Sequence, residues 1–352
     1  MSRIIVGMSG GVDSAVCAYL LRAAGHEVIG VTLKTLSSDT RCCEINEARL
    51  AADQMGIPYY VKSVMSEFCA YVTEPFVREY LAGRTPNPCT ACNRRIKWDG
   101  LLQMADALGA EYVATGHYAM VGQLSDGRYS VRQAESKEKD QTYFLYQLSQ
   151  SQLSRTIMPL GKLDKPTVRR IAKAAGIPTF NKPDSQEICF LEGDENYADY
   201  IEEHADAEAP ALQPGHFVTE DGTVLGEHRG LIHYTVGQRK GLGLAMGAPV
   251  YVKELRPQTN EVVVSSDAAL YASSLVCAGL HFMSIPDLPV GQTHRAIVKI
   301  RYRHVGTPAL LTRVSPEALR VDFDAPVRAV SPGQAAVFYE DGYVLGGGLI
   351  VR

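Results

Sequence analysis

Residues 3–14 read RIIVGMSGGVDS, and this stretch decides the fold of the N-terminal half. Its first six residues form a short β-branched run, which predicts a buried strand. A glycine-rich turn follows from Ser9 to Ser14, and an apolar helical pattern then continues to Gly25. A strand, a glycine-rich turn and a helix N-terminus together favour phosphate binding. Backbone N–H groups can approach the phosphate closely there, and the helix dipole favours its negative charge.

This loop is not a Walker A loop, because no G-x-x-x-x-G-K-[ST] motif occurs in the chain. It resembles instead the SGGxDS loop of the ATP pyrophosphatases, which break ATP between its α- and β-phosphates. The alternative is that the glycines only tighten a strand–helix turn. The position of the loop directly after an N-terminal strand argues against that reading.

Bulk composition sets wider limits. A chain of 352 residues is long for one core, so two or three domains are expected. An apolar content of 46% with 21% charged residues is typical of a soluble globular protein. No apolar run approaches the roughly 18 residues of a membrane span and no signal peptide is recognisable, so we expect a cytoplasmic protein with no membrane contact. The net charge of −4 gives no general attraction to nucleic acid, so any RNA contact needs local basic patches.

The first half of the chain alternates between strand and helix patterns. Strands are expected at 4–8, 27–33, 57–64 and 111–118, and helices at 44–55, 68–80 and 96–108. Another helix opens at Asp164-Lys165-Pro166 and closes at Gly176. This alternation predicts an α/β domain with a doubly wound parallel sheet. Ligands bind beyond the carboxyl ends of such strands, where both the Ser9 loop and Gly116-His117 fall.

Beyond about residue 200 the pattern changes to short β-rich runs separated by glycine, proline and Asp-Gly turns. Turn signals at this spacing predict two small β-rich domains, the last of them barrel-like. We expect a catalytic domain at 1–204, a small central domain at 205–270 and a C-terminal domain at 271–352.

Two cysteine features stand out among the eight cysteines of the chain. Cys89 and Cys92 form a C-x-x-C motif just before a basic helical segment, and positive neighbours at a helix N-terminus are expected to lower a thiol pKa. Cys189 stands alone after a turn. The C-x-x-C motif alone fits a redox pair, half a zinc site or part of an iron–sulfur site. The adjacent Cys42 and Cys43 are ambiguous.

Three further groups of residues are weaker signals. His117 ends a predicted strand and could face a nucleotide, although a core histidine is the commoner reading. The segment 139–145 reads as a helix start with Asp140 as its cap. Alternating basic residues in the C-terminal part could follow a phosphate backbone, although such a run is usually a solvated face. They are Arg295, Lys299, Arg301 and Arg303, with Arg239-Lys240 upstream.

A set of motifs occurs in one order over the whole chain: SGGVDS, NP-x-x-x-CN, TGHYA, KDQTYFLY, DSQEICF, GLIHYTVGQRKGLG, VYVKELRPQTNEVVV, RYRH and SPGQAAVFY. With them the sequence closely resembles the tRNA-specific 2-thiouridylases of the MnmA family. The resemblance implies ATP-dependent exchange of oxygen for sulfur at C2 of the wobble uridine in tRNAs for Lys, Glu and Gln. It also implies ATP with Mg²⁺, and a cysteine desulfurase or a sulfur-relay protein as sulfur donor. A monomer is the default.

The resemblance also assigns roles within the nucleotide site. Asp13 would be a magnesium or phosphate-side ligand, and His117 would support the reacting groups. The residues implied in ATP binding are Gly7, Met8, Ser9, Gly10, Gly11, Val12, Asp13, Ser14, Leu33 and Gly116. Leu33 stands where relatives often have Met, a near-isosteric exchange.

In the family scheme Cys189 carries a persulfide and Cys92 is its catalytic partner. Cys92 either attacks the terminal sulfur to free hydrosulfide or closes a disulfide with Cys189 as sulfur leaves. The target base must be flipped out of the anticodon stack. The residues that match tRNA contacts are Asn87, Pro88, Cys89, Lys139, Asp140, Gln141, Arg301, Tyr302 and Gln334.

One departure from the family opens a second mechanism. Many relatives have Asp where this chain has Cys89, so Cys89, Cys92 and Cys189 could instead hold a [4Fe–4S] cluster that carries hydrosulfide. The persulfide route needs only Cys92 and Cys189. Two other classes remain as alternatives: an ATP pyrophosphatase that acts as a ligase or amidotransferase, and a non-enzymatic RNA-binding protein that keeps the ATP fold.

Overall fold

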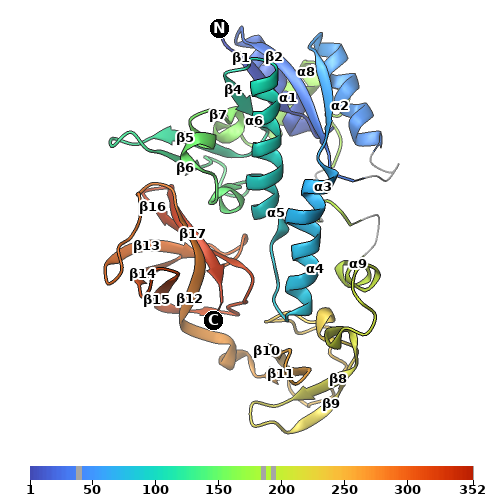
Figure 1. Cartoon of the computed structure of the whole chain (residues 1–352), viewed down its shortest axis with the longest axis vertical. Coiled ribbons are helices and arrows are strands. Elements are labelled where there is room, and N and C mark those ends of the chain that lie inside the picture. Colours follow the sequence, from blue (N-terminus) through green and yellow to red (C-terminus); the bar gives the residue numbers. More distant parts are fainter. Residues whose placement is uncertain (37–41, 184–187, 192–195, 352) are drawn as a thin grey trace.

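The computed structural model describes residues 1–36, 42–183, 188–191 and 196–351. The first sheet has the strand order β3-β2-β1-β4-β7, and all of its neighbouring strands are parallel. Its strands are β1 (Arg3–Gly7), β2 (Glu27–Lys34), β3 (Tyr59–Ser63), β4 (Tyr112–Ala114) and β7 (Thr156–Ile157). The predicted parallel sheet is therefore confirmed, with β1 at its centre (Figure 1).

Helices cover both faces of this sheet. Because side chains alternate along a strand, Ile4 and Val6 of β1 face one way and Ile5 the other. Ile4 and Val6 share a buried cluster with α1 (Val12–Ala23), α2 (Cys42–Met55) and α8 (Lys165–Ala174). Ile5 packs against α6 (Asp99–Ala107) on the opposite face. This two-sided burial explains the continuous apolar run in β1.

The helical segments around the cysteine motif contain π-helical turns. α3 (Met65–Phe68), the π-helix η2 (Cys69–Thr73) and α4 (Glu74–Leu81) follow one another without a break. Likewise α5 (Pro88–Ala91) runs into the π-helix η3 (Cys92–Trp98) and then into α6. The expected helix 68–80 thus lies within a longer segment, and the expected helix 96–108 is the C-terminal part of a segment that begins at Pro88 and ends at Ala107. The sequence analysis predicted ordinary α-helices here and did not predict the π-helical turns. Such turns occur frequently at functional sites.

The C-terminal part is a closed antiparallel barrel. Its strand order is β12-β15-β14-β13-β16-β17, and a pairing between β12 and β17 closes it. The strands are β12 (Tyr271–Phe282), β13 (Thr293–Lys299), β14 (Thr307–Arg313), β15 (Ala318–Arg328), β16 (Ala335–Glu340) and β17 (Tyr343–Ile350). Buried side chains such as Val298, Leu311 and Phe338 fill its interior.

A hairpin of the first domain joins this barrel. β5 (Ala119–Gln123) pairs with β6 (Tyr129–Gln133), and β6 continues the barrel sheet next to β17. The Ser130 hydroxyl donates to the Val344 carbonyl at 2.7 Å, and Tyr143 donates to the Ala335 carbonyl at 2.9 Å. The two parts of the chain therefore share one buried core, which periodicity alone did not reveal.

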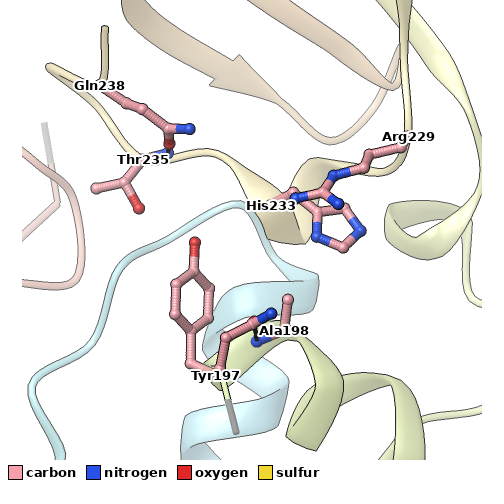
Figure 2. A pocket seen from close by; sticks show the side chains of 7 residues that line it. Tyr197, Ala198, Arg229, His233, Thr235 and Gln238 are labelled. Atoms are coloured by element: carbon pink, nitrogen blue, oxygen red, sulfur yellow. Dashed lines mark hydrogen bonds between the residues drawn. The ribbon is translucent and has the colours of Figure 1, made fainter. Parts of the chain in front are cut away.

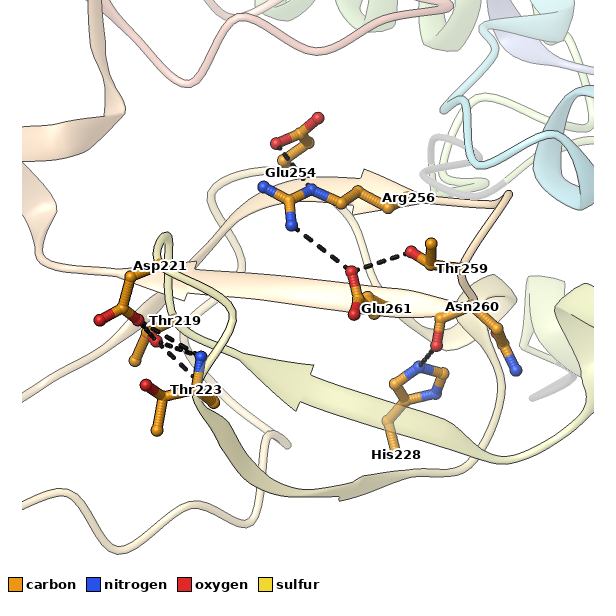
Figure 3. A network of polar contacts seen from close by, with 9 residues as sticks. All are labelled: Thr219, Asp221, Thr223, His228, Glu254, Arg256, Thr259, Asn260 and Glu261. Atoms are coloured by element: carbon orange, nitrogen blue, oxygen red, sulfur yellow. Dashed lines mark hydrogen bonds and ion pairs between the residues drawn. The ribbon is translucent and has the colours of Figure 1, made fainter.

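The segment between them forms a small sheet of order β10-β11-β8-β9. Its strands are β8 (Gly215–Val218), β9 (Val224–His228), β10 (Tyr251–Arg256) and β11 (Glu261–Ser265). Polar contacts fix its turns (Figure 3). Thr219 and Asp221 close the β8–β9 turn, while Thr259 donates to Glu261 at 2.8 Å in the β10–β11 hairpin. His228 bonds the Asn260 carbonyl at 3.0 Å and so ties the two hairpins together.

Short helices complete the described residues. They are η4 (Thr142–Leu145), α7 (Gln150–Leu153), η5 (Pro159–Lys162), α9 (Tyr197–His204), η6 (Pro210–Leu212), η7 (Leu231–His233) and η8 (Asp267–Leu270). Asp164 caps α8 by accepting the Thr167 N–H at 2.9 Å, and the helix begins where the sequence predicted. The predicted cap at Asp140 is wrong, because Gln141 is the cap residue of the 3₁₀-helix η4. No helix in the described part of the chain is both long and apolar enough to cross a membrane.

Candidate active site

The SGGVDS loop links the end of β1 to the start of α1. Gly10 has φ +73°, a conformation that glycine adopts without strain. The Ser14 hydroxyl donates to the Gly11 carbonyl at 3.0 Å and accepts the Ser9 N–H at 3.1 Å. Gly11 begins the helix without a side-chain cap among the described residues. The loop is thus braced internally at a helix N-terminus, which is the geometry of an anion site.

The Asp13 carboxylate is held by two residues from distant segments. The Lys165 ammonium lies 2.8 Å from both of its oxygens, and the Tyr118 hydroxyl donates to Oδ1 at 2.8 Å (the Lys165 side chain is 10% exposed). Lys165 is the first residue of α8, so the N-termini of α1 and α8 meet at this pair. A buried cation therefore lies beside the phosphate loop.

Gly116 lies against the backbone of the same loop. A Cβ at this position would stand 2.7 Å from the Asp13 carbonyl carbon and 2.8 Å from the Ser14 nitrogen. Real Cβ atoms do not approach backbone so closely, and therefore only glycine fits. The turn after β4 thus backs onto the SGGVDS loop, as the sequence predicted for neighbouring carboxyl ends.

Leu33 lies near the end of β2, next to the strand that enters the loop. The Met8 N–H donates to the Val31 carbonyl at 2.8 Å, which keeps the two strand ends together. The partly buried Leu33 side chain packs between two apolar clusters and against Gly100 of α6. It provides an apolar wall beside the loop.

His117 follows Gly116 in the chain. Its Nδ1 lies 2.8 Å from the Thr115 hydroxyl, and its ring lies 5.5 Å from the Trp98 ring between centroids. Burial lowers the pKa of His117 well below its usual value, and the positive charge of Lys97 lowers it further. The imidazole is therefore neutral at physiological pH and can act as a hydrogen-bond donor or acceptor.

The thiols of the C-x-x-C motif are protonated in this structure. Burial raises the pKa of Cys92 to about 12 and raises that of Cys89, while Lys97 lowers both to a smaller extent. The expectation of a lowered pKa is wrong in this conformation, because loss of solvation outweighs the basic neighbour. Cys92 is 6% exposed, so it is shielded as well as protonated.

Cys189 is exposed and lies within electrostatic range of the other two thiols, since its charge raises the pKa of both Cys89 and Cys92. The next residue, Phe190, is buried with its ring 5.1 Å from Phe76 and 5.0 Å from Tyr200. The structure therefore places Cys189 near enough to both thiols of the C-x-x-C motif to affect their ionisation. Residues 184–187 of the DSQEICF motif lie outside the described residues, as do the side chains of Cys42 and Cys43.

The side chains do not form a metal centre as they stand. Within the described ranges, no three His, Cys, Asp or Glu side chains converge in the manner of a metal site. The three cysteines have unequal environments, with Cys92 buried and Cys189 exposed. This arrangement does not fit a preformed cradle for a [4Fe–4S] cluster.

The residues that match the tRNA contacts of the family lie in two places. One is the loop before the C-x-x-C motif, where the Asn87 side chain accepts the Cys89 N–H at 3.1 Å and so starts α5 at Pro88. The barrel touches this loop, because Gln334 donates to the Thr85 carbonyl at 2.9 Å.

The other place surrounds η4. Asp140 is 5% exposed and accepts from the Ala134 N–H and the Thr142 hydroxyl at 3.0 and 2.7 Å. The Gln141 side chain accepts the Tyr118 N–H at 2.9 Å. The buried Asp140 carboxylate thus organises its own loop, and the neighbouring Lys139 is only partly exposed.

The barrel contributes Arg301 and Tyr302 beside η4. Tyr302 packs its ring 4.5 Å from Phe144, and Arg301 donates to the Arg328 carbonyl at 2.9 Å. The basic series on β13 is not a uniform free face: Arg295 pairs with Asp324, and Lys299 lies 4.0 Å from Asp140.

Sequence reasoning missed three residues of this site: Tyr118, Lys165 and Trp98. Lys97 belongs to the basic segment after the C-x-x-C motif, which the sequence analysis did single out. One signal was available for Lys165. A cation in the first turn of a helix opposes the helix dipole, so a lysine directly after the Asp164 cap needs a local anionic partner. No pattern in the chain indicated that Trp98 would touch His117.

The fold and the site together define an ATP pyrophosphatase of the SGGxDS-loop class with a thiol centre. Three family models match in order: a tRNA methyl transferase HUP domain at residues 2–193, a tRNA methyl transferase PRC-barrel domain at 199–266 and an aminomethyltransferase β-barrel domain at 274–350. The chain belongs to the tRNA-specific 2-thiouridylase (MnmA) family. It is 47% identical to the tRNA-specific 2-thiouridylase MnmA of Lachnoclostridium phytofermentans, with 100% of both chains covered. It is 44% identical to that of Carboxydothermus hydrogenoformans, covering 99% of this chain and 98% of the relative.

A distant likeness was found among solved structures. The U34-tRNA thiolase NcsA from Methanococcus maripaludis, solved with its [4Fe–4S] cluster, is 18% identical with a TM-score of 0.38, covering 58% of this chain and 65% of that one. At that score the likeness says nothing about the cysteines of this chain.

Proposed function

We propose that this chain catalyses the ATP-dependent 2-thiolation of the wobble uridine of tRNA. Full-length membership of the MnmA family supports this activity. The observation that carries the proposal is the position of Lys97, whose charge acts both on His117, next to the phosphate loop, and on the thiols of Cys89 and Cys92. Nucleotide chemistry and sulfur chemistry can therefore meet around one side chain.

The first step is activation of the base by ATP. The O2 oxygen of uridine is a poor leaving group, so it attacks the α-phosphate, pyrophosphate leaves and an AMP ester remains. Residues 7–14 hold the phosphates, and Leu33 and Gly116 line the adenine and ribose. Lys165 supplies positive charge to the phosphates, and Asp13 orients the Mg²⁺ that enters with ATP.

The second step transfers sulfur. Cys189 carries a persulfide delivered by a cysteine desulfurase or a sulfur-relay protein. The Cys92 thiolate attacks the Cys189 Sγ, so that a Cys92–Cys189 disulfide forms and the terminal sulfur leaves as hydrosulfide. Hydrosulfide attacks C2 of the activated base and AMP departs. A thiol reductant then restores both cysteines. His117 assists as a neutral hydrogen-bonding group beside the base.

Binding of tRNA completes the thiol half of the site. The pKa of Cys92 is about 12 in the free protein, so its thiolate is scarce at neutral pH. We assign the target base to Asn87, Pro88 and Cys89. Further tRNA contacts are assigned to Lys139, Gln141, Arg301, Tyr302 and Gln334. Asp140 acts indirectly, through the loop it holds. The substrates are tRNAs for Lys, Glu and Gln, and the acting form is a monomer.

We also propose that the domain boundaries lie at residues 204 and 270. They separate the catalytic domain from the small central sheet and that sheet from the barrel. No reaction step is assigned to an iron–sulfur cluster, because the cysteine environments do not fit one.

The test is nucleoside mass spectrometry of unmodified tRNA-Glu incubated with iron-free enzyme, Mg-ATP and a persulfide donor. We expect 2-thiouridine to form at a useful rate. Formation only after anaerobic iron–sulfur reconstitution would assign Cys89, Cys92 and Cys189 to a cluster. No product under either condition would reject the thiouridylase function. Product formation that persists in Cys92→Ser and Cys189→Ser would reject the sulfur-transfer steps.

A further inference from the structure

One basic motif of the sequence has no role in the proposed reaction steps. Arg239 and Lys240 lie in the glycine-rich segment between η7 and β10, and residues 237–241 around them are called the basic loop below. Both side chains are exposed, and neither forms an ion pair with any residue that the structure describes. Because the whole chain has a net charge of −4, a contact with RNA needs positive charge that is concentrated locally.

Two other cations of the same small sheet are already paired with carboxylates. On β10, Lys253 pairs with Glu220, and Arg256 lies 3.4 Å from both Glu254 and Glu261. A carboxylate beside a cation offsets its attraction for a phosphate, because the two charges act on the ligand with opposite sign. The basic loop therefore offers positive charge that no described carboxylate offsets.

The basic loop is held in place by Gln238. The Gln238 side chain accepts the Thr235 N–H at 3.0 Å and donates to the Lys240 carbonyl at 3.1 Å. Its own carbonyl accepts the Val252 N–H of β10 at 2.9 Å. Figure 2 shows Gln238 beside Thr235 at the edge of a pocket. Since the loop is ordered before any ligand arrives, binding costs little conformational entropy there.

One end of the basic loop packs against the barrel. A Cβ on Gly237, which has φ +90°, would stand 2.8 Å from the Cβ of Ala329. The preceding residue, Arg328, accepts the Arg301 guanidinium at its carbonyl at 2.9 Å. Arg301 is one of the proposed tRNA contacts. The basic loop therefore adjoins the surface of the barrel to which those contacts are assigned.

The other end of the loop is anchored in the core of the thiol region. Leu242 follows two residues after Lys240 and is 7% exposed. It belongs to the buried apolar cluster that also contains Cys92 and Phe190. The segment that carries the two cations is thus connected both to the barrel and to the packing around Cys92.

We propose that the basic loop binds phosphodiesters of the tRNA backbone through Arg239 and Lys240. The inference rests on the proposed function, because the RNA substrate supplies the phosphates. A guanidinium and an ammonium on an exposed loop recognise charge rather than base sequence, so this contact positions the tRNA and does not select the target base. Continuity with the proposed tRNA contacts of the barrel favours RNA over an acidic protein surface.

The test compares the double variant Arg239→Gln/Lys240→Gln with the wild type, using an unmodified tRNA-Glu transcript over a series of salt concentrations. Loss of two phosphate contacts should reduce the slope of log K against log salt by about two, and weaken binding about ten- to a hundredfold at low salt. The exchange Arg239→Lys/Lys240→Arg should keep the slope. The matched control is Lys253→Gln/Arg256→Gln, which removes the same charge from paired cations and should keep the wild-type slope.

Wild-type affinity and slope in Arg239→Gln/Lys240→Gln would overturn the inference. Equal losses in the two Gln double variants would also overturn it, because net charge alone would then explain them. A tRNA-Phe transcript should lose affinity to the same extent, and a loss confined to tRNA-Glu would reject a backbone contact. Thermal unfolding shows that the variants are folded.

The outcome is separate from that of the proposed function. If the wild type forms 2-thiouridine while Arg239→Gln/Lys240→Gln binds normally, only this inference fails. If the wild type forms no 2-thiouridine but the slope still falls by about two in that variant, only the proposed function fails.

Discussion

The phosphate loop and the thiol centre lie in one domain, but their side chains are preorganised to different degrees. At the loop, Asp13 already has Lys165 and Tyr118 at 2.8 Å, and Gly116 is packed against the backbone. At the thiol centre, Cys92 is buried and protonated while Cys189 is exposed. The nucleotide half is preorganised and the sulfur half is held inactive. In the proposed mechanism, this state keeps the Cys189 persulfide from a strong nucleophile until substrate RNA is bound.

The largest expected effect separates the two halves. Cys189→Ser should abolish 2-thiouridine formation, a loss of about a thousandfold or more, because the hydroxyl cannot carry sulfur. Binding of ATP should stay at the wild-type level. Nucleoside mass spectrometry and nucleotide titration measure the two. Cys69→Ser is the control, since Cys69 is also exposed but lies on η2. A comparable loss in Cys69→Ser would contradict the assignment.

The protonated state of Cys92 can be measured directly. With a pKa of about 12, the thiolate fraction at pH 8 is about 10⁻⁴. Iodoacetamide should therefore alkylate Cys92 about a thousandfold more slowly than a cysteine in a short peptide. The rate should rise about tenfold per pH unit, because deprotonation of the thiol limits it below its pKa. Peptide mass spectrometry reports the site. Fast labelling of Cys92 at pH 7 in tRNA-free protein would show that its thiol is not held protonated. The sulfur half would then not be inactive in the free protein.

The substitution Lys165→Ala disrupts the preorganised nucleotide half of the site. It removes the cation that holds Asp13 and faces the phosphates, so tRNA-dependent pyrophosphate release should fall about a hundredfold. Lys162→Ala is the matched control, since this exposed lysine lies three residues earlier. If both variants release pyrophosphate at the wild-type rate, Lys165 has no part in ATP use.

The sequence carried different amounts of information about the two halves. The loop, its strand and helix, and the approach of Gly116 follow from local glycine chemistry and from the rule for parallel sheets. The pKa of Cys92 could not be read from its basic neighbours, because it depends on burial by residues far along the chain, including Phe190. The joining of β6 to the barrel was hidden for a similar reason. A five-residue strand carries no signal of which distant edge it will pair with.

Gly116→Ala tests how tightly the nucleotide half is packed. A Cβ 2.7 Å from the Asp13 backbone must displace the loop, so ATP-dependent pyrophosphate release should fall about tenfold. Tm should drop by a few degrees. Gly226→Ala is the control, because its nearest contact for a Cβ is an ordinary 3.4 Å to a leucine methyl. An unchanged rate would mean that the close packing is unimportant for phosphate binding.

Gln334→Ala gives the smallest effect and connects the barrel to the sulfur half. The side chain donates to the Thr85 carbonyl at 2.9 Å, just before the loop that precedes Cys89 and Cys92. Loss of one such bond is worth about 1 kcal/mol, so thiolation should slow two- to fivefold. Amide exchange around Thr85 should speed up, while pyrophosphate release stays unchanged. A slower pyrophosphate release instead would place the barrel contact on the nucleotide side of the site, and the two halves would then be coupled rather than distinct.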